Sequence, residues 1–181
     1  MPTSALRAKV AALFKKGDKA KTADAKGIVL EEIVVFMFSK VKGVPQKLMR
    51  RNSTNHQVSQ EIDVTMWNDR LDEGLEFLPN VLIAECKNWD QPVGSNEIDV
   101  FVAKLRNRGC PVGFLVAASG ISGKAHELRN AHERIANALD RGISVIVLTR
   151  RELLGIGSAG ELVHLLKAKL VLLGACRTSI E

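Results

Sequence analysis

Cysteine and long apolar runs are both scarce in this sequence of 181 residues. The three cysteines, Cys86, Cys110 and Cys176, are an odd number without C-x-x-C spacing, which argues against a disulfide framework and against a zinc knuckle. The longest apolar runs, such as residues 33–38 and 113–118, are too short to span a bilayer, and the N-terminus carries charges where a signal peptide needs apolar residues. We therefore expect a cytoplasmic protein without membrane contacts.

Two further patterns fall short of a ligand site. Residues 119–124 (SGISGK) lack the G-x-x-x-x-G-K-[ST] spacing of a nucleotide-binding loop, so we interpret them mainly as the cap of a following helix. His126 and His132 are six residues apart on that predicted helix, so they do not share a face, and no cysteine is near them. We expect both histidines to be surface or structural residues.

The composition is that of one globular domain, with 46% hydrophobic and 25% charged residues. The net charge of +6 is unevenly distributed, because residues 1–51 contain 12 Lys/Arg and four Asp/Glu. Such a basic region suits a polyanion, since Lys and Arg that neutralise phosphates release condensed counterions. Solubility alone explains the charge equally well, so charge supports a nucleic-acid partner without establishing it.

Hydrophobic periodicity predicts an α/β protein without internal repeats. Helical spacing of apolar residues predicts helices over residues 3–16, 28–41, about 95–108, 124–140 and 161–173. Alternation or short apolar runs predict strands over residues 60–67, 81–87, 112–118 and 143–148. The last two strands and the helix between them read as a βαβ unit, whose strands are normally parallel. We expect a basic helix and linker over 1–26, a core over 27–155 and a C-terminal helical extension over 156–181.

Charged residues end the second predicted strand, Val81–Lys87. Glu85 and Lys87 are two residues apart and therefore share a face of this strand, which is apolar enough for the middle of a sheet. Asp63 lies on the polar face of the preceding strand and can supply a second carboxylate. Glu-x-Lys alone is a common solvated strand pair, but burial of an unpaired charge is costly, so this combination indicates a functional site.

The two carboxylates form a hard-oxygen site, which suits Mg²⁺ or Mn²⁺ better than zinc. Mg²⁺ held by Asp63, Glu85 and the backbone carbonyl of Cys86 would bind a phosphate oxygen, neutralise charge in the transition state and acidify a bound water. Lys87 would then orient the attacking water or stabilise the pentacovalent phosphorus. This arrangement predicts a metal-dependent phosphodiesterase that needs no organic cofactor.

These residues resemble the PD-(D/E)xK nuclease superfamily, and within it the Mrr-like restriction endonucleases and the archaeal-type Holliday junction resolvases. The resemblance rests on residues 61–64 (EIDV), 83–89 (IAECKNW) and 113–120 (GFLVAASG), and extends over about residues 26–150. It implies a restriction-endonuclease-like core, a central mixed β-sheet flanked by helices. It also implies that Asp63 and Glu85 are metal ligands and that Lys87 orients the water.

An acidic residue on the first helix of the core is a further metal ligand in that family, often through a water. Residues 27–31 (GIVLE) match this pattern, and Glu31 competes with its neighbour Glu32 for the role. Glu31 lies on a strongly apolar helix face beside Val34 and Val35, whereas Glu32 lies nearer Ser39. We favour Glu31, although one glutamate could be solvated while the other merely flanks the core.

The resemblance implies a Mg²⁺-dependent endonuclease that hydrolyses DNA in restriction and defence or in repair. Because cutting two strands usually takes two sites, a homodimer is also possible, and the leucine-rich C-terminal helix offers a surface for it. A structure-specific junction resolvase and a non-catalytic nucleic-acid-binding or assembly subunit with the same fold are the alternatives. Asn88 and Gln91 are second-tier candidates for phosphate or water contacts. Trp67 and Trp89 could stack on bases, but we expect them to fill the core.

Overall fold

The computed structural model describes residues 4–54, 61–123 and 130–180. These residues form α-helices, one short 3-10 helix and strands, and helices and strands alternate only from β3 to α5. In chain order the elements are α1 (Ala5–Asp18), α2 (Ala23–Phe38), η1 (Gln46–Leu48), β1 (Arg50–Thr54), β2 (Glu61–Trp67), β3 (Val81–Lys87), α3 (Ser95–Asn107), β4 (Val112–Ala117), α4 (Ala131–Asp140), β5 (Ser144–Leu148), α5 (Arg150–Gly155) and α6 (Ala159–Cys176). No helix in these described ranges is both long and apolar enough to cross a membrane.

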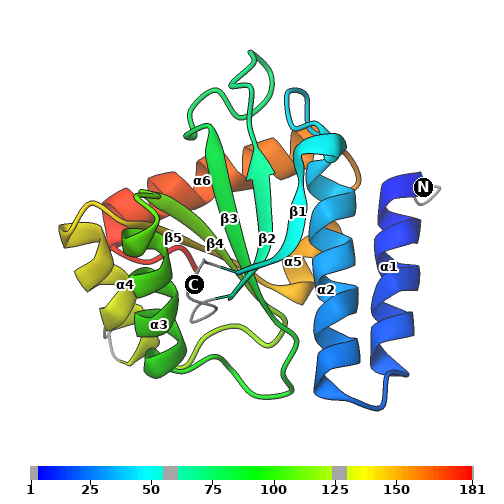
Figure 1. The fold of residues 1–181 in the computed structure, drawn as a ribbon, viewed down its shortest axis with the longest axis horizontal. Coiled ribbons are helices and arrows are strands. Elements are labelled where there is room, and N and C mark those ends of the chain that lie inside the picture. Colours follow the sequence, from blue (N-terminus) through cyan, green and yellow to red (C-terminus); the bar gives the residue numbers. More distant parts are fainter. Residues whose placement is uncertain (1–3, 55–60, 124–129, 181) are drawn as a thin grey trace.

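The strands form one sheet in the order β1-β2-β3-β4-β5 (Figure 1). β1, β2 and β3 pair antiparallel, with Val64 opposite Ala84, whereas β3, β4 and β5 pair parallel, with Glu85 opposite Leu115. The sheet is therefore mixed, as predicted. Its parallel half is the predicted βαβ arrangement, in which a helix must carry the chain back to start the next strand.

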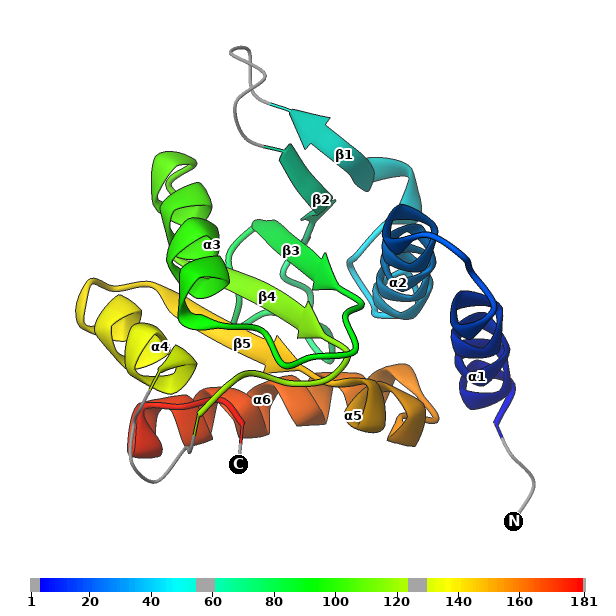
Figure 2. The same ribbon diagram turned by 90° about the horizontal axis from the view of Figure 1, so that it is seen from below.

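Helices cover both faces of the sheet (Figure 2). α3 and α4 pack on one face and enclose a core with the alternate residues Ile83, Leu115 and Val145. α2, α5 and α6 lie on the other face, and α1 packs outside α2, around a core that includes Ala84 and Phe114. Because successive side chains of a strand point to opposite faces, this assigns Glu85 and Lys87 to the face covered by α3.

The path of α3 is fixed by a close approach to β4. A Cβ at Gly113 would lie 2.6 Å from both Leu105 side-chain methyls and 2.7 Å from Cζ of Phe101. Only a residue without a side chain lets the helix pack this near the strand. This contact sets how far the other side chains of α3 stand from the centre of the sheet.

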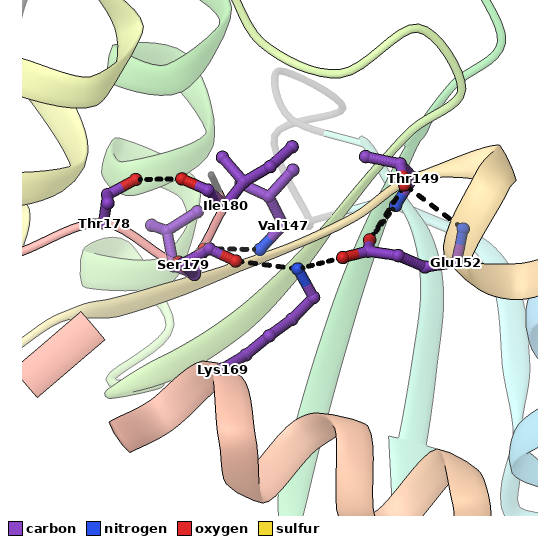
Figure 3. A network of polar contacts seen from close by, with 8 residues as sticks. Val147, Thr149, Glu152, Lys169, Thr178, Ser179 and Ile180 are labelled. Atoms are coloured by element: carbon purple, nitrogen blue, oxygen red, sulfur yellow. Dashed lines mark hydrogen bonds and ion pairs between the residues drawn. The ribbon is translucent and has the colours of Figure 1, made fainter. Parts of the chain in front are cut away.

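The chain after α6 turns back and covers the outer edge of β5 (Figure 3). The Ser179 hydroxyl accepts from the Val147 amide at 2.9 Å and donates to the Val145 carbonyl at 3.0 Å, so one side chain satisfies both groups of an edge strand. Lys169 of α6 donates to the Ser179 carbonyl at 2.7 Å and pairs with Glu152 of α5 at 2.7 Å. The buried ammonium thus joins α5, α6 and the C-terminal segment.

Several predicted boundaries differ from the structure. α2 begins at Ala23, five residues before its predicted start, because Thr22 accepts the Ala25 amide as an N-cap. α1 continues through Gly17 to Asp18, two residues beyond its predicted end, and α6 extends three residues beyond the predicted Leu173. Strand β1 and helix α5 were not predicted at all.

The structure tests the expectations about the two tryptophans and about His132, whereas His126 lies outside the described residues. Trp67 and Trp89 were expected in the core, and this was wrong, because they are 38% and 41% exposed. His132 is structural as expected, being buried with Nδ1 2.9 Å from the Thr178 hydroxyl. His126, and the start of the helix predicted from Lys124, fall outside the described ranges.

Candidate active site

The candidate site lies where strands β2 and β3 separate. Their register ends with Val64 opposite Ala84, and beyond it the Asp63 carboxylate accepts the Cys86 amide through Oδ2 at 2.6 Å. On the other side of β2 the residue facing Asp63 is Asn52, which has a φ of +51°. A side chain therefore replaces the backbone partner of Cys86, and Asp63 is held against β3 by its own hydrogen bond.

The Cys86 backbone offers a third oxygen beside the two carboxylates. The amide and carbonyl of one strand residue point toward the same neighbouring strand, so the Cys86 carbonyl is directed to the side on which Asp63 lies. Its thiol points to the opposite face and is buried in the core with α2. Burial, followed by the charges of Asp63, Glu31 and Glu85, raises the pKa of this thiol well above its ordinary value, so the thiol stays protonated.

Asp63 stands in an unfavourable place for a negative charge. Burial, together with the nearby Glu85 carboxylate, raises the pKa of Asp63 from 3.8 to about 6, although the Cys86 amide and the ammonium groups of Lys87 and Lys104 oppose the shift. Two carboxylates in a poorly solvated pocket thus repel each other. A cation that contacts both would relieve this repulsion.

Glu85 is almost completely buried, with 3% of its surface exposed, and two lysines neutralise it. Lys87 Nζ lies 3.0 Å from its Oε1, and Lys104 Nζ from α3 lies 2.8 Å from both Oε1 and Oε2. Burial alone would lower the pKa of Lys87, but its contact with Glu85 and the charge of Asp63 raise it, so Lys87 is an ammonium ion here. The Lys87 ammonium also lies 5.4 Å from the ring centre of Trp89.

Of the two neighbouring glutamates on α2, Glu31 faces the interior and Glu32 does not. Glu31 is 7% exposed, and Arg51 of β1 binds its Oε2 through Nε and Nη2, each at 2.9 Å. Glu32 points outward and pairs with Lys16 at 3.0 Å. Among the described residues no three His, Cys, Asp or Glu side chains are placed to hold one metal ion. The structure thus joins Glu31 to Arg51, and its role as a metal ligand stays a prediction.

The second-tier candidates occupy supporting positions. Asn88 donates to the Lys26 carbonyl at 2.9 Å and so ties the end of β3 to the start of α2. Gln91 is exposed in the following loop. Sequence reasoning missed Arg51 and Lys104, although Lys104 stands directly before Leu105 and three residues after Phe101, at the border of the buried stripe of α3.

A comparison with protein families decides the class of this chain. A family model described as a restriction endonuclease, Mrr_cat, matches residues 29–154, which is more than half of the chain. The chain belongs to the Mrr_cat restriction endonuclease family. The match spans Glu31, Asp63, Glu85 and Lys87 and confirms the predicted Mrr-like, restriction-endonuclease-like fold. No curated protein and no solved structure matches the chain.

The oxygen atoms of this Mrr_cat domain could hold a divalent cation. Restriction-endonuclease-like families generally use divalent metals. Asp63, Glu85 and the Cys86 carbonyl supply hard oxygen donors, and Mg²⁺ commonly takes one or two carboxylates and keeps waters at its other positions. The raised pKa of Asp63 supports the fit, because burial and the neighbouring Glu85 charge make the ionised carboxylate unfavourable as long as no cation contacts it.

The Mrr_cat site opens toward β1 and β2. Asp63 and Thr65 are only half-buried and Trp67 is exposed on the face of β2 that is shared with Glu85 and Lys87. On that face α3 and α4 cover β4 and β5, while none of the helices in the described ranges lies over the β1–β2 half (Figure 2). A polymeric substrate could therefore reach the carboxylates across the uncovered half of the sheet.

Proposed function

We propose that this Mrr_cat nuclease hydrolyses DNA phosphodiester bonds with Mg²⁺ or Mn²⁺ at Asp63, Glu85 and Lys87. One observation carries the proposal: the Asp63 side chain leaves the β2–β3 ladder and lies beside the Glu85–Lys87 pair, with its carboxylate fixed by the Cys86 amide. Two carboxylates and an ammonium in one partly buried cluster are the groups that metal-assisted phosphoryl hydrolysis requires.

Each residue has a role that follows from its contacts. Asp63 and Glu85, with the Cys86 carbonyl, would hold the cation, which supplies charge neutralisation and a more acidic water when it is bound. The Cys86 amide fixes the direction of the Asp63 carboxylate through the 2.6 Å hydrogen bond. Glu31, close enough to affect the Cys86 thiol, would contact the metal through a water once Arg51 releases it.

Lys87 would act on the attacking water and on the phosphorus. Its ammonium lies 3.0 Å from Glu85 and remains charged, so it can donate hydrogen bonds to a water or to the developing negative charge on phosphate oxygens. Lys87 ends β3 and is only partly buried, so solvent or a substrate can reach it. We expect a positioning and electrostatic role for Lys87, since a charged ammonium cannot accept a proton.

The second candidate is a non-catalytic DNA-binding or assembly subunit. One observation favours it: Glu31 and Glu85 are each paired with protein cations, Arg51 for the first and Lys87 and Lys104 for the second. In such a subunit the site would be a buried ion-pair network that holds strands and helices together. Metal binding that depends on Asp63 separates the two candidates.

The test is cleavage of supercoiled plasmid, linear duplex, single strand and a four-way junction, with and without Mg²⁺ or Mn²⁺. We expect cleavage of at least one substrate, lost by at least about 100-fold in Asp63→Ala and in Lys87→Ala. Lys42→Ala, which removes an exposed lysine paired with Glu73, and Asp99→Ala are matched controls that should cut like the wild type. No cleavage of any substrate, or active Asp63→Ala protein, would refute the proposal.

A further inference from the structure

Lys104 is the cation that holds the Glu85 carboxylate most closely. Its Nζ lies 2.8 Å from both carboxylate oxygens, whereas Lys87 contacts only Oε1, at 3.0 Å. The Lys104 side chain is 12% exposed, and Gly113 fixes the helix that carries it against β4. The ammonium therefore occupies the symmetric position between both oxygens, where a chelated cation would lie.

This contact competes with metal binding. A carboxylate oxygen that accepts a charge-assisted hydrogen bond must give up that bond, or share it, before it can coordinate a cation. The ammonium also repels a second positive charge, and this repulsion is weakly screened in a buried pocket. Asp63, Glu85, Lys87 and Lys104 together have no net formal charge, so the pocket of the free protein has little excess negative charge to attract a metal.

Lys104 can leave Glu85 without moving its helix. Its charge is at the end of four methylene groups, and part of the side chain already reaches solvent. A DNA phosphate bound beside the carboxylates would offer this ammonium another anion to contact. The same lysine could thus hold Glu85 before substrate arrives and bind phosphate afterwards.

We propose that Lys104 is a positioning residue that occupies both oxygens of Glu85 in the free protein and releases them when DNA supplies a phosphate, so that divalent-metal binding and DNA binding favour each other. The inference rests on the proposed function, because it assumes that Glu85 is a metal ligand. If Lys104 weakens metal binding only while DNA is absent, then DNA binding strengthens metal binding, and by linkage metal binding strengthens DNA binding to the same extent.

Calorimetric titration of the intact protein with Mn²⁺ and Ca²⁺, alone and with a short DNA duplex shown intact by electrophoresis, tests this inference. We expect Lys104→Met to bind metal at least about tenfold more tightly than the wild type without DNA, which corresponds to about 1.4 kcal/mol. DNA should tighten metal binding in the wild type and much less in Lys104→Met. Lys104→Arg keeps the charge and can still bind both oxygens of Glu85, so metal binding without DNA should remain weak, as in the wild type.

Two controls separate this inference from the fold and from the proposed function. Arg106→Met removes an exposed charge from the same helix and should leave metal affinity unchanged. Circular dichroism checks that each variant folds. If Lys104→Met does not fold, Lys104→Gln takes its place. If the wild type and Lys104→Met bind metal with equal Asp63-dependent affinity, or if DNA strengthens metal binding equally in both, the inference about Lys104 is wrong while the proposed function stands. No Asp63-dependent metal binding in any of these proteins overturns the proposed function as well.

Discussion

Replacing Asp63 by Asn should make the metal-free protein more stable near neutral pH. The asparagine amide keeps an oxygen that can accept the Cys86 amide, now 2.6 Å from Asp63 Oδ2, and it removes the charge that burial and Glu85 make unfavourable. Side chains that serve a cation or substrate are often unfavourable for the fold without that ligand. The expected gain in stability would therefore be a direct sign that Asp63 is placed for function.

The magnitude follows from the pKa of Asp63, which the folded protein raises from 3.8 to about 6. A shift of about two units corresponds to about 3 kcal/mol at about 1.4 kcal/mol per unit, and solvent screening of this half-buried group reduces it to about 1–2 kcal/mol. A raised carboxyl pKa destabilises the folded state only when the group is ionised. The penalty is therefore absent below about pH 4, grows between pH 4 and 6, and is complete above pH 6.

Urea unfolding followed by circular dichroism, with chelator present, measures this difference. Asp63→Asn should be about 1–2 kcal/mol more stable than the wild type at pH 7.5 and no more stable at pH 3.5. Asp99→Asn, which removes an exposed carboxylate paired with Arg134, should change stability by less than about 0.5 kcal/mol at pH 7.5. An Asp63→Asn protein that is less stable than the wild type at pH 7.5 would refute the reasoning.

Two further predictions concern the pH dependence of cleavage and the buried Lys169, which joins α5, α6 and the C-terminal segment. The rate of cleavage at subsaturating Mg²⁺ should fall as the pH drops through about 6, because protonated Asp63 cannot bind metal. A higher Mg²⁺ concentration should move the midpoint of this fall to lower pH. A rate that does not change between pH 5 and 8 would contradict this prediction. Lys169→Met should lower the free energy of unfolding by about 2–4 kcal/mol, because Glu152 and the Ser179 carbonyl lose a buried partner (Figure 3). The control is Lys167→Met, which changes another lysine of α6 and removes its exposed ion pair with Glu76; it should change stability by less than about 1 kcal/mol. Equal effects of the two variants would contradict a stabilising role for the buried Lys169.

The central strands and the inward glutamate could be predicted because local patterns determine them. Alternation over two residues placed Glu85 and Lys87 on one face, and the helical period placed Glu31 toward the core; burial in the structure agrees with both. β1 escaped prediction because its sequence, RRNST, has no apolar alternation, being an edge strand that pairs only with β2. α2 was predicted to start late because its first turn, although capped by Thr22, follows a Lys-rich stretch that resembles a linker.

The exposure of Trp67 and Trp89 shows where composition misled the sequence reading. Large aromatic side chains are usually at least partly buried, and that expectation placed both in the core. Trp67 instead ends an antiparallel strand beyond the helical cover and bonds through Nε1 to Asp69 at 2.8 Å, while Trp89 follows β3 and lies beside the Lys87 ammonium. Trp89 therefore lies beside the candidate site, whereas Trp67 lies at the other end of the β2–β3 pair, opposite Val81.

The cations of the site could not be found from local sequence, because they come from elements that meet only in the folded chain. Arg51 reaches Glu31 from β1, and Lys104 reaches Glu85 from α3, across 20 and 19 residues respectively. The acidic residues carry the family pattern. Which cation pairs with each of them in the free protein depends on how the helices and strands pack, for example on the close approach of α3 to Gly113. The sequence motif thus indicates which groups would carry out the proposed chemistry, and we expect the surrounding lysines and arginine to determine how readily those groups accept a metal.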